Sequence, residues 1–166
     1  MRSFQTKRLL ASTIQESDAP AIDPIWSDPS VTEFLNIEPI HSFDDTVQRI
    51  RTLQQKAVER RAVRYTLIRK DTKEVVGTAG FNRLDLDHKV GEIGYELAEA
   101  HWGQGFGTEI VEALHSVALH GFGLETLQAI VHEDNVRSSH LLEKLHFHEV
   151  PFDRPNKKCY EKSLLH

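Results

Sequence analysis

The stretch His101-Trp102-Gly103-Gln104-Gly105-Phe106-Gly107-Thr108 is the most informative part of this chain. Its three glycines at alternate positions let the backbone turn sharply and bring main-chain N–H groups close to a ligand. A helix that begins directly after them presents the positive end of its dipole to an anion. The stretch therefore indicates a pyrophosphate cradle, and a glycine-rich connection without a ligand fits it equally well.

The glycine spacing argues against two common nucleotide-binding motifs. The sequence lacks the Lys-Ser/Thr pair of a Walker loop, and G-x-G-x-G does not satisfy the pattern G-x-G-x-x-G. Nucleotide hydrolysis and NAD binding are therefore both poorly supported.

Three strand-like runs precede the glycine stretch, at residues 64–69, 75–84 and 90–97. Their apolar side chains recur with a period of two, and short polar turns at 70–73 and 85–88 separate them. The pattern predicts an antiparallel meander of three strands.

Apolar spacing predicts four helices. The best marked one follows Ser42, which forms a capping-box pattern with Asp45 and precedes an apolar stripe of Phe43, Val47, Ile50, Leu53 and Ala57. The other three are a first helix that starts at Ser17 or Asp18 and ends before Ser27-Asp28-Pro29, a helix over 108–120 that stops at Gly121, and a helix over 135–145.

Further strands are predicted at 8–14, at 126–131 and, as two short strands, between 147 and 164. The complete order is βααβββαβαββ, which predicts an α/β (α+β) protein with a mixed sheet of six to seven strands. Since the chain contains no linker, low-complexity tract or internal repeat, we expect residues 1–166 to form a single domain.

The composition is that of a soluble globular protein. The 166 residues are 39% hydrophobic and 27% charged, with a mean hydropathy of -0.42. No apolar run reaches the length of about 18 residues that a membrane helix needs, and the basic N-terminus has no apolar signal core. We therefore expect a cytoplasmic protein that has no membrane partner.

The charge balance limits the partners. Lys and Arg number 20 against 25 Asp and Glu, which gives a formal net charge of -5 and a pI near 6.0. This balance gives no support to nonspecific nucleic-acid binding and weakly favours cationic small molecules or basic peptides.

Metal chemistry is also poorly supported. Cys159 is the sole cysteine, so neither an internal disulfide nor a thiolate metal cage can form. His140, His146 and His148 do not have a metal-ligand spacing, and we expect no metal site.

Four stretches in one order resemble a known family. They are Thr6-Lys7-Arg8-Leu9-Leu10, Val90-Gly91-Glu92-Ile93-Gly94-Tyr95-Glu96-Leu97, the loop from Trp102 to Glu109, and Asn135-x-x-Ser138 followed by Leu142-Glu143-Lys144-Leu145. Together they resemble the GNAT superfamily of acetyl-CoA-dependent N-acetyltransferases, most closely its RimJ/RimL branch of ribosomal-protein-alanine acetyltransferases. The resemblance implies the GNAT fold, a strongly bent mixed sheet that is splayed between its fourth and fifth strands and holds acetyl-CoA in the splay.

The resemblance also assigns the cofactor contacts. Pyrophosphate is expected on the loop of Gly103, Gln104, Gly105, Phe106, Gly107 and Thr108, and the pantetheine arm on the main chain of Leu97 and Ala98. Asn135 matches a side chain that contacts the cofactor near its thiol end, and it equally fits a helix N-cap. Trp102 replaces the usual Gln or Arg, as in many RimJ/RimL-like sequences, and His146 replaces a glycine.

For catalysis, an attacking amine must lose a proton and the departing thiolate must gain one. Glu92 resembles the general base of several GNAT enzymes, although a solvated strand glutamate fits it equally well, and Glu96 is the weaker candidate. The tyrosine that many members use as acid is Leu142 here. Ser138 matches the serine that the RimL-like branch holds near the thioester, and Tyr160 is a fallback without a motif.

The resulting function is the transfer of an acetyl group from acetyl-CoA to a primary amine. The RimJ/RimL resemblance favours a protein N-terminal amine as acceptor. A polyamine, an aminoglycoside or an amino-acid-like metabolite stays open, as does a non-catalytic acyl-CoA-binding sensor. The sequence also leaves the choice between a monomer and a homodimer open.

Overall fold

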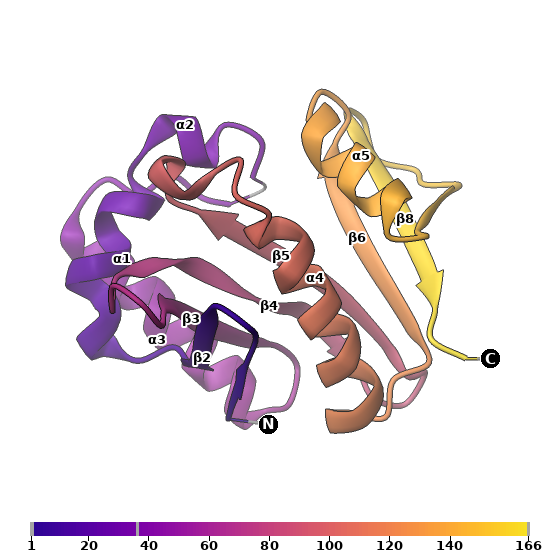
Figure 1. Ribbon diagram of the computed structural model, residues 1–166, viewed down its shortest axis with the longest axis horizontal. Coiled ribbons are helices and arrows are strands. Elements are labelled where there is room, and N and C mark those ends of the chain that lie inside the picture. The colour runs from indigo at the N-terminus through magenta and orange to yellow at the C-terminus, as the bar shows by residue number, and fades with distance from the viewer. Residues whose placement is uncertain (1, 36, 166) are drawn as a thin grey trace.

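One mixed sheet of eight strands organises the chain in the computed structural model, which describes residues 2–35 and 37–165 (Figure 1). The strands are β1 (Ser3–Gln5), β2 (Leu9–Thr13), β3 (Val63–Arg69), β4 (Val75–Asp85), β5 (Val90–Leu97), β6 (Thr126–His132), β7 (His148–Val150) and β8 (Lys157–Ser163). Their order in the sheet is β1-β2-β3-β4-β5-β6-β8-β7. All neighbours are antiparallel except β5 and β6, which are parallel.

The helical segments lie between these strands. They are η1 (Glu16–Asp18), α1 (Ala19–Trp26), α2 (Pro29–Thr32), α3 (Phe43–Val58), η2 (Glu99–His101), α4 (Phe106–Ser116), η3 (Val117–Gly121) and α5 (Val136–Lys144). In Figure 1, α4 passes in front of the sheet, α5 lies beside β6, and α1 lies at the opposite end from α5.

The parallel pairing of β5 with β6 is short. It joins Val90–Ile93 to Thr126–Ala129. The later residues of β5 stay paired with β4, up to Leu97 opposite Gly77, while the later residues of β6 stay paired with β8. The two strands therefore diverge, and the expected splay between the fourth and fifth predicted strands is confirmed.

The fold class predicted from the sequence is confirmed, and the meander of β3, β4 and β5 is antiparallel as expected. Among the short elements that were not predicted are α2 and β1, and β1 brings the strand count to eight. β1 has three residues with only one partly buried side chain, too few to give an alternating pattern. The four-residue helix α2 starts at the Asp28-Pro29 pair, where the sequence indicated only a turn.

The predicted start of α3 is confirmed with one adjustment. The Ser42 hydroxyl accepts a hydrogen bond from the Asp45 N–H at 3.2 Å, while the Asp45 carboxylate accepts from the His41 N–H at 2.9 Å. The reciprocal bond thus reaches one residue further back than in a standard capping box. Ile50 on the predicted stripe is fully buried, but Phe43 is 50% exposed.

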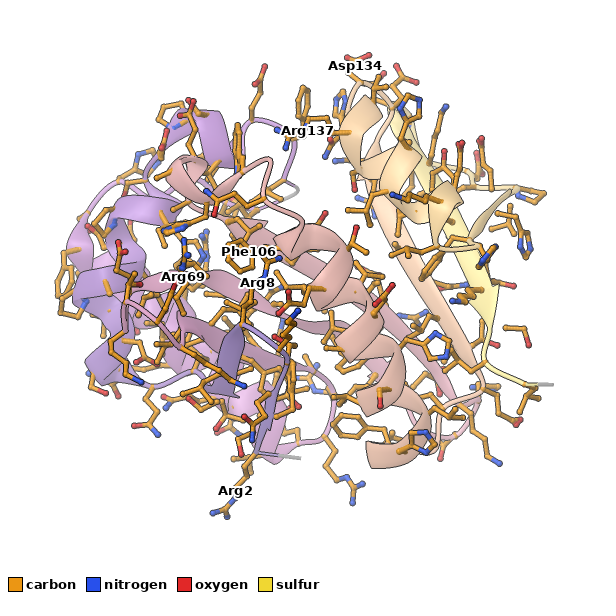
Figure 2. The ribbon with its side chains drawn as sticks, viewed as in Figure 1. Arg2, Arg8, Arg69, Phe106, Asp134 and Arg137 are labelled. Atoms are coloured by element: carbon orange, nitrogen blue, oxygen red, sulfur yellow. The ribbon has the colours of Figure 1, made fainter. Side chains whose placement is uncertain are left out.

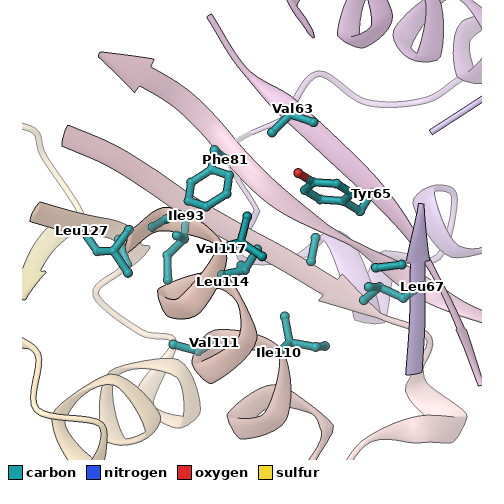
Figure 3. Packing of buried hydrophobic residues seen from close by; sticks show 14 of the residues in the cluster. Val63, Tyr65, Leu67, Phe81, Ile93, Ile110, Val111, Leu114, Val117 and Leu127 are labelled. Carbon is teal, nitrogen blue, oxygen red and sulfur yellow. The ribbon is translucent and has the colours of Figure 1, made fainter. Parts of the chain in front are cut away.

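Two hydrophobic clusters hold the helices on the sheet. The larger one packs α4 against the central strands and includes Tyr65, Phe81, Ile93, Ile110, Val111, Leu114, Val117 and Leu127 (Figure 3). The smaller one joins α1 to α3 through Ile14, Ala19, Ile22, Trp26 and Ile50. Among the described helices, none is long and apolar enough to cross a membrane.

Leu114 tests the packing of α4 because its side chain is fully buried in the larger cluster. Leu114→Ala should lower the free energy of unfolding by about 2–5 kcal/mol, since the change leaves a cavity between α4 and the sheet. Val58→Ala is the control, because Val58 is 78% exposed and its loss should change stability by no more than about 0.5 kcal/mol. Equal losses of unfolding free energy in the two variants, measured by urea denaturation, would contradict this account of the core.

Candidate active site

A cleft of about 730 Å³ opens at the splay of the sheet. Its walls come from the end of β5, the loop before α4, the first turns of α4 and α5, the end of β6, and residues 30–35 and 37. The cleft brings together nine of the residues predicted for the site, namely Glu92, Leu97, Gly103, Gly105, Phe106, Gly107, Thr108, Asn135 and Ser138. Ala98 and Gln104 are not among its lining residues.

The loop before α4 turns as its glycines predict. Gly103 and Gly105 have φ values of 72° and 83°, in the left-handed region that favours glycine. Gly105 is the N-cap of α4 and supplies no side-chain cap. The first intrahelical bond runs from the Glu109 N–H to the Gly105 carbonyl at 3.2 Å, so the preceding N–H groups of the first turn are available to an anion.

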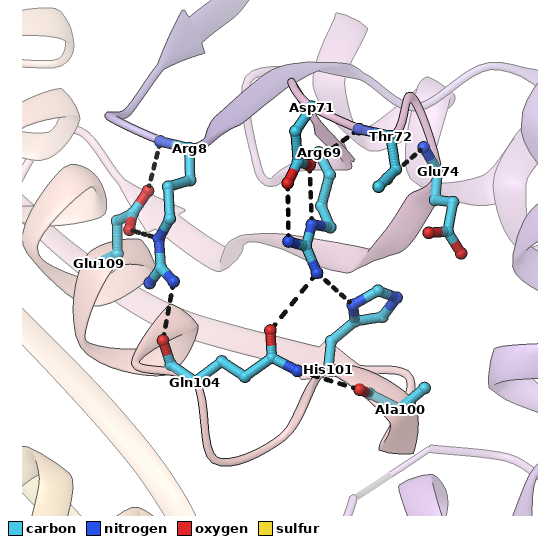
Figure 4. Close-up of polar contacts among 9 residues, drawn as sticks. All are labelled: Arg8, Arg69, Asp71, Thr72, Glu74, Ala100, His101, Gln104 and Glu109. Atoms are coloured by element: carbon cyan, nitrogen blue, oxygen red, sulfur yellow. Dashed lines mark hydrogen bonds and ion pairs between the residues drawn. The ribbon is translucent and has the colours of Figure 1, made fainter.

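The loop is tied to the N-terminal segment through Arg8 and Glu109 (Figure 4). The Arg8 side chain donates to Glu109 through Nε at 2.8 Å and to the Gln104 carbonyl through Nη1 at 2.8 Å. The Arg8 main-chain N–H donates to the second Glu109 oxygen at 2.9 Å, and the Thr6 hydroxyl donates to the same oxygen. Burial works to raise the pKa of Glu109, but these hydrogen bonds outweigh it and hold that pKa below its usual value.

A second arginine, Arg69 at the end of β3, supports the loop before α4. The Arg8 and Arg69 guanidinium groups lie 4.0 and 5.3 Å from the centre of the Phe106 ring (Figure 2). Arg69 pairs with Asp71 at 2.9 Å and approaches the side chains of Gln104 and His101 at 3.4 Å (Figure 4). Gln104 therefore holds the loop in place with its carbonyl and side chain, and the buried His101 belongs to the same support.

The end of β5 turns main-chain groups toward the splay. The Ala98 N–H donates to the Val76 carbonyl of β4 at 2.8 Å, so it is committed to the sheet. Because bonding directions alternate along an antiparallel strand, the main-chain groups of Tyr95 and Leu97 point away from β4. The Trp102 indole already donates to the Leu97 carbonyl at 2.9 Å, which leaves the Leu97 N–H facing the cleft.

Tyr95 is a site residue that the motifs did not reveal. Its phenol hydrogen-bonds Ser138, and a Cβ placed on Gly107 would lie 3.1 Å from the phenol oxygen. Burial raises the pKa of Tyr95, against smaller opposing effects from the Arg137 charge and the Ser138 hydrogen bond. The phenol thus stays protonated between the first turns of α4 and α5. The only sequence signal was its place on the β5 face opposite Glu92.

Asn135 caps α5 and also lines the cleft. Its side-chain oxygen accepts from the Ser138 N–H at 3.3 Å, as the N-cap prediction required. The next turn brings Arg137 over the Trp102 ring at 5.1 Å, which joins α5 to the loop before α4.

The two glutamates on one face of β5 have different surroundings. Glu96 accepts from the Trp26 indole at 2.6 Å and pairs with Arg64 at 3.3 Å, and the Thr78 hydroxyl also donates to it. Its side chain is only 9% exposed. Glu92 is half-buried, accepts a hydrogen bond from the Asn82 amide at 3.3 Å on one oxygen, and lines the cleft.

The remaining catalytic candidates lie elsewhere. Tyr160 is fully buried, donates to Glu143 at 3.2 Å and does not line the cleft, so the fallback acid is not placed near Glu92. His146 adopts φ 73°, the left-handed conformation that a glycine would take at this turn. In residues 2–35 and 37–165, no group of three or more His, Cys, Asp or Glu side chains is arranged to hold a metal ion.

Residues on either side of position 36 form the outer wall of the cleft, namely Ser30, Val31, Glu33, Phe34, Leu35 and Ile37. Phe34 packs against His132 at the end of β6, with 5.5 Å between the ring centres. This contact spans the opening between the two halves of the splayed sheet.

The family is now defined by comparison. Residues 8–148 match the family model of the acetyltransferase (GNAT) domain. The chain therefore belongs to the GNAT acetyltransferases and is an acetyl-CoA-dependent acetyltransferase, as the resemblance implied.

Three relatives illustrate the similarity. The N-acetyltransferase p20 of Bacillus licheniformis is 35% identical over 159 residues, which cover 96% of this chain and 89% of that protein. The structure of RimL, a ribosomal L7/L12 alpha-N-protein acetyltransferase in complex with coenzyme A, has a TM-score of 0.84 at 19% identity and 95% coverage of both chains. Spermidine N-acetyltransferase from Vibrio cholerae, in complex with CoA and spermine, has a TM-score of 0.81 at 17% identity, covering 94% of this chain and 95% of that one. At these identities the two solved structures show the shared fold alone.

Acid titration tests the tie between Arg8 and Glu109. Because the pKa of Glu109 is lowered from 4.5 in the folded chain, its stabilising contribution is present above the unfolded pKa and is lost as the pH falls through the folded one. Wild type should melt above Glu109→Gln at neutral pH, and the two melting temperatures should converge between about pH 5 and pH 3. Glu149→Gln is the control, since Glu149 is exposed. If the difference in melting temperature between wild type and Glu109→Gln stayed constant down to pH 3, the stabilising role of ionised Glu109 would be contradicted.

Proposed function

We propose that this acetyltransferase modifies a protein N-terminal amine, with Glu92 as general base and the Gly103–Thr108 loop as the pyrophosphate site. The observation that carries the proposal is the cleft itself, which the glycine loop, Ser138 and Glu92 all line. Glu92 lies on the face of β5 opposite Tyr95, whose phenol reaches Gly107 and Ser138. A donor and an acceptor that enter from opposite sides would meet between the diverging ends of β5 and β6.

The residues present suit acetyl-CoA, whose contribution is the activated acetyl thioester. The N–H groups of Gly105, Gly107 and Thr108, together with Gln104 in the same loop, would hold the pyrophosphate at the start of α4. The Leu97 N–H would pair with an amide of the pantetheine arm, and Asn135 with Ser138 lies toward the thiol end. Ala98 would contribute through its position beside Leu97, since its own N–H is bound to β4.

The acceptor amine arrives mainly as an ammonium ion at neutral pH. Glu92 takes one proton from it, directly or through a water, so that the nitrogen lone pair can attack the acetyl carbon. As the carbon–sulfur bond breaks, the attacking nitrogen loses its second proton to the solvent, and the sulfur takes a proton from the solvent, directly or by relay through the Ser138 hydroxyl, which Tyr95 hydrogen-bonds. Glu96 is unsuited to the base role because Trp26, Arg64 and Thr78 occupy its oxygens.

The cleft carries both signs of charge. Arg64, Arg137, Arg154 and Lys157 line it together with Glu33, Glu92, Glu96 and Glu99. An N-terminal peptide brings one ammonium group and a chain of amides, which suits a mixed lining and an open groove. The spermidine enzyme among the structural neighbours keeps a small polyamine as the second candidate.

An acceptor panel tests this proposal. Release of free CoA should be fastest with short peptides that have a free N-terminus, and the same peptides with a blocked N-terminus should give background rates. Faster turnover of spermidine than of any peptide would favour the second candidate. Binding of acetyl-CoA without CoA release for any amine would identify a sensor domain instead of this enzyme.

Glu92→Gln tests the base. The change keeps the shape of the side chain but removes its ability to take a proton, so turnover should fall about 10²–10⁴-fold while acetyl-CoA binding survives. The acid limb of kcat/KM should also flatten until the rate follows only the fraction of free amine. Wild-type turnover with an unchanged acid limb would exclude Glu92 as the base.

Gly105→Val tests the cradle. Valine resists the left-handed conformation and blocks close approach to the main chain, so acetyl-CoA affinity measured by calorimetry should fall by about ten-fold or more, the effect of one lost charge-assisted bond. Gly123→Val is a matched control, because Gly123 also has a positive φ, of 64°, with open space around it and no place in the cleft. Equal acetyl-CoA affinity in the two variants would show that the loop does not bind the cofactor.

A further inference from the structure

Asn82 lies at a β-bulge opposite Glu92. In the β4–β5 pairing Phe81 is opposite Ile93 and Arg83 is opposite Glu92, so Asn82 is the extra residue. A regular strand would place Phe81 and Leu84 on opposite faces. The bulge keeps both in the core and turns the two polar residues between them to the face of Glu92.

Gly94 leaves the space that the Asn82 side chain fills. A Cβ on Gly94 would lie 2.5 Å from the Asn82 amide nitrogen and 3.0 Å from its oxygen, closer than such atoms can approach. The missing side chain on β5 thus lets the amide lie flat on the strand, within reach of Glu92.

Arg64 fixes which way the Asn82 amide points. Its guanidinium donates to the Asn82 oxygen and is itself held by the Gly94 carbonyl at 3.5 Å and by Glu96 at 3.3 Å. A guanidinium has no acceptor atom, so the amide oxygen must face Arg64 and the NH₂ group must face the other way. The NH₂ group then donates to one oxygen of Glu92 at 3.3 Å.

We propose that Asn82, oriented by Arg64, is a positioning residue for Glu92. By donating to one carboxylate oxygen, it holds the side chain in place and leaves the second oxygen to receive the proton of the acceptor. This inference rests on the proposed role of Glu92 as base and adds the residue that orients it.

The other groups around Glu92 come from the neighbouring strands. Arg83 is opposite it on β4, and Gln128 is its register partner on β6. On β8, the buried Cys159 has its pKa raised by burial and further by the charges of Glu161 and Glu92. Gln128 donates to Glu161 at 3.0 Å, so it is an amide on the same face that serves a different carboxylate.

This arrangement supplies a matched set of variants. Asn82→Leu removes the donor, and Gly94→Ala leaves both Asn82 and Glu92 intact but pushes the amide away. Gln128→Met is the control, since it removes a neighbouring amide from the same sheet face.

The measurement is kcat/KM as a function of pH with the best acceptor. The difference between wild type and Glu92→Gln on the acid side of this profile is the contribution of Glu92. Melting temperature and acetyl-CoA affinity show which variants are folded. If either Asn82→Leu or Gly94→Ala fails to fold, the other one still tests the proposal.

We expect kcat/KM on the acid limb to fall by about three- to ten-fold in Asn82→Leu and Gly94→Ala, the effect of losing one hydrogen bond that holds Glu92 in place. Gln128→Met should keep the wild-type profile. In the Glu92→Gln background, Asn82→Leu should have no further effect on the limb.

Two results would overturn the inference alone, with Glu92→Gln impaired as proposed. One is wild-type kcat/KM on the acid limb in Asn82→Leu, and the other is an equal loss of kcat/KM in Gln128→Met. If Glu92→Gln itself keeps the wild-type rate and acid limb, the base assignment fails, and the inference fails with it. The single Glu92 variant therefore separates failure of the proposed function from failure of the role of Asn82.

Discussion

The short parallel pairing between β5 and β6 is the constraint on which the rest of the molecule depends. Four residue pairs, from Val90 with Thr126 to Ile93 with Ala129, hold the two halves of the sheet together before they separate. Beyond Ile93, β5 has a paired strand on one side only. Main-chain groups on its other side therefore need other hydrogen-bond partners where they are buried. A ligand that carries amides along its length can supply them. The same opening therefore forms the cleft and leaves main-chain groups that a bound cofactor can satisfy.

Much of this architecture could be predicted from periodicity alone. The meander, the cap at Ser42, the left-handed turn at Gly105 and the cap at Asn135 all depend on residues within a few positions of one another. The bulge at Asn82 was missed, although two polar residues between Phe81 and Leu84 break the alternation and were a visible signal. The short elements β1 and α2 carry too few residues for any period to show.

The site was harder to predict because its chemistry depends on tertiary neighbours. Glu92 and Glu96 are four residues apart on one face of one strand, and only the family resemblance favours Glu92 over Glu96. Their difference comes from Trp26 and Arg64, which reach Glu96 from α1 and β3 and leave Glu92 to a single amide donor. Likewise, a pairing of Arg8 with Glu109 follows only once the N-terminal segment is seen beside α4.

That pairing has a consequence for how the protein folds. Arg8 and Glu109 are 101 residues apart, so the contact closes nearly two thirds of the chain into a loop, and closing long loops is entropically costly and slow. During synthesis the glycine turn emerges from the ribosome long after the segment that braces it. The N-terminal segment must therefore stay available until α4 has formed. This segment is made well before α4 and is among the last parts to complete the cradle, which makes the cofactor site a late product of folding.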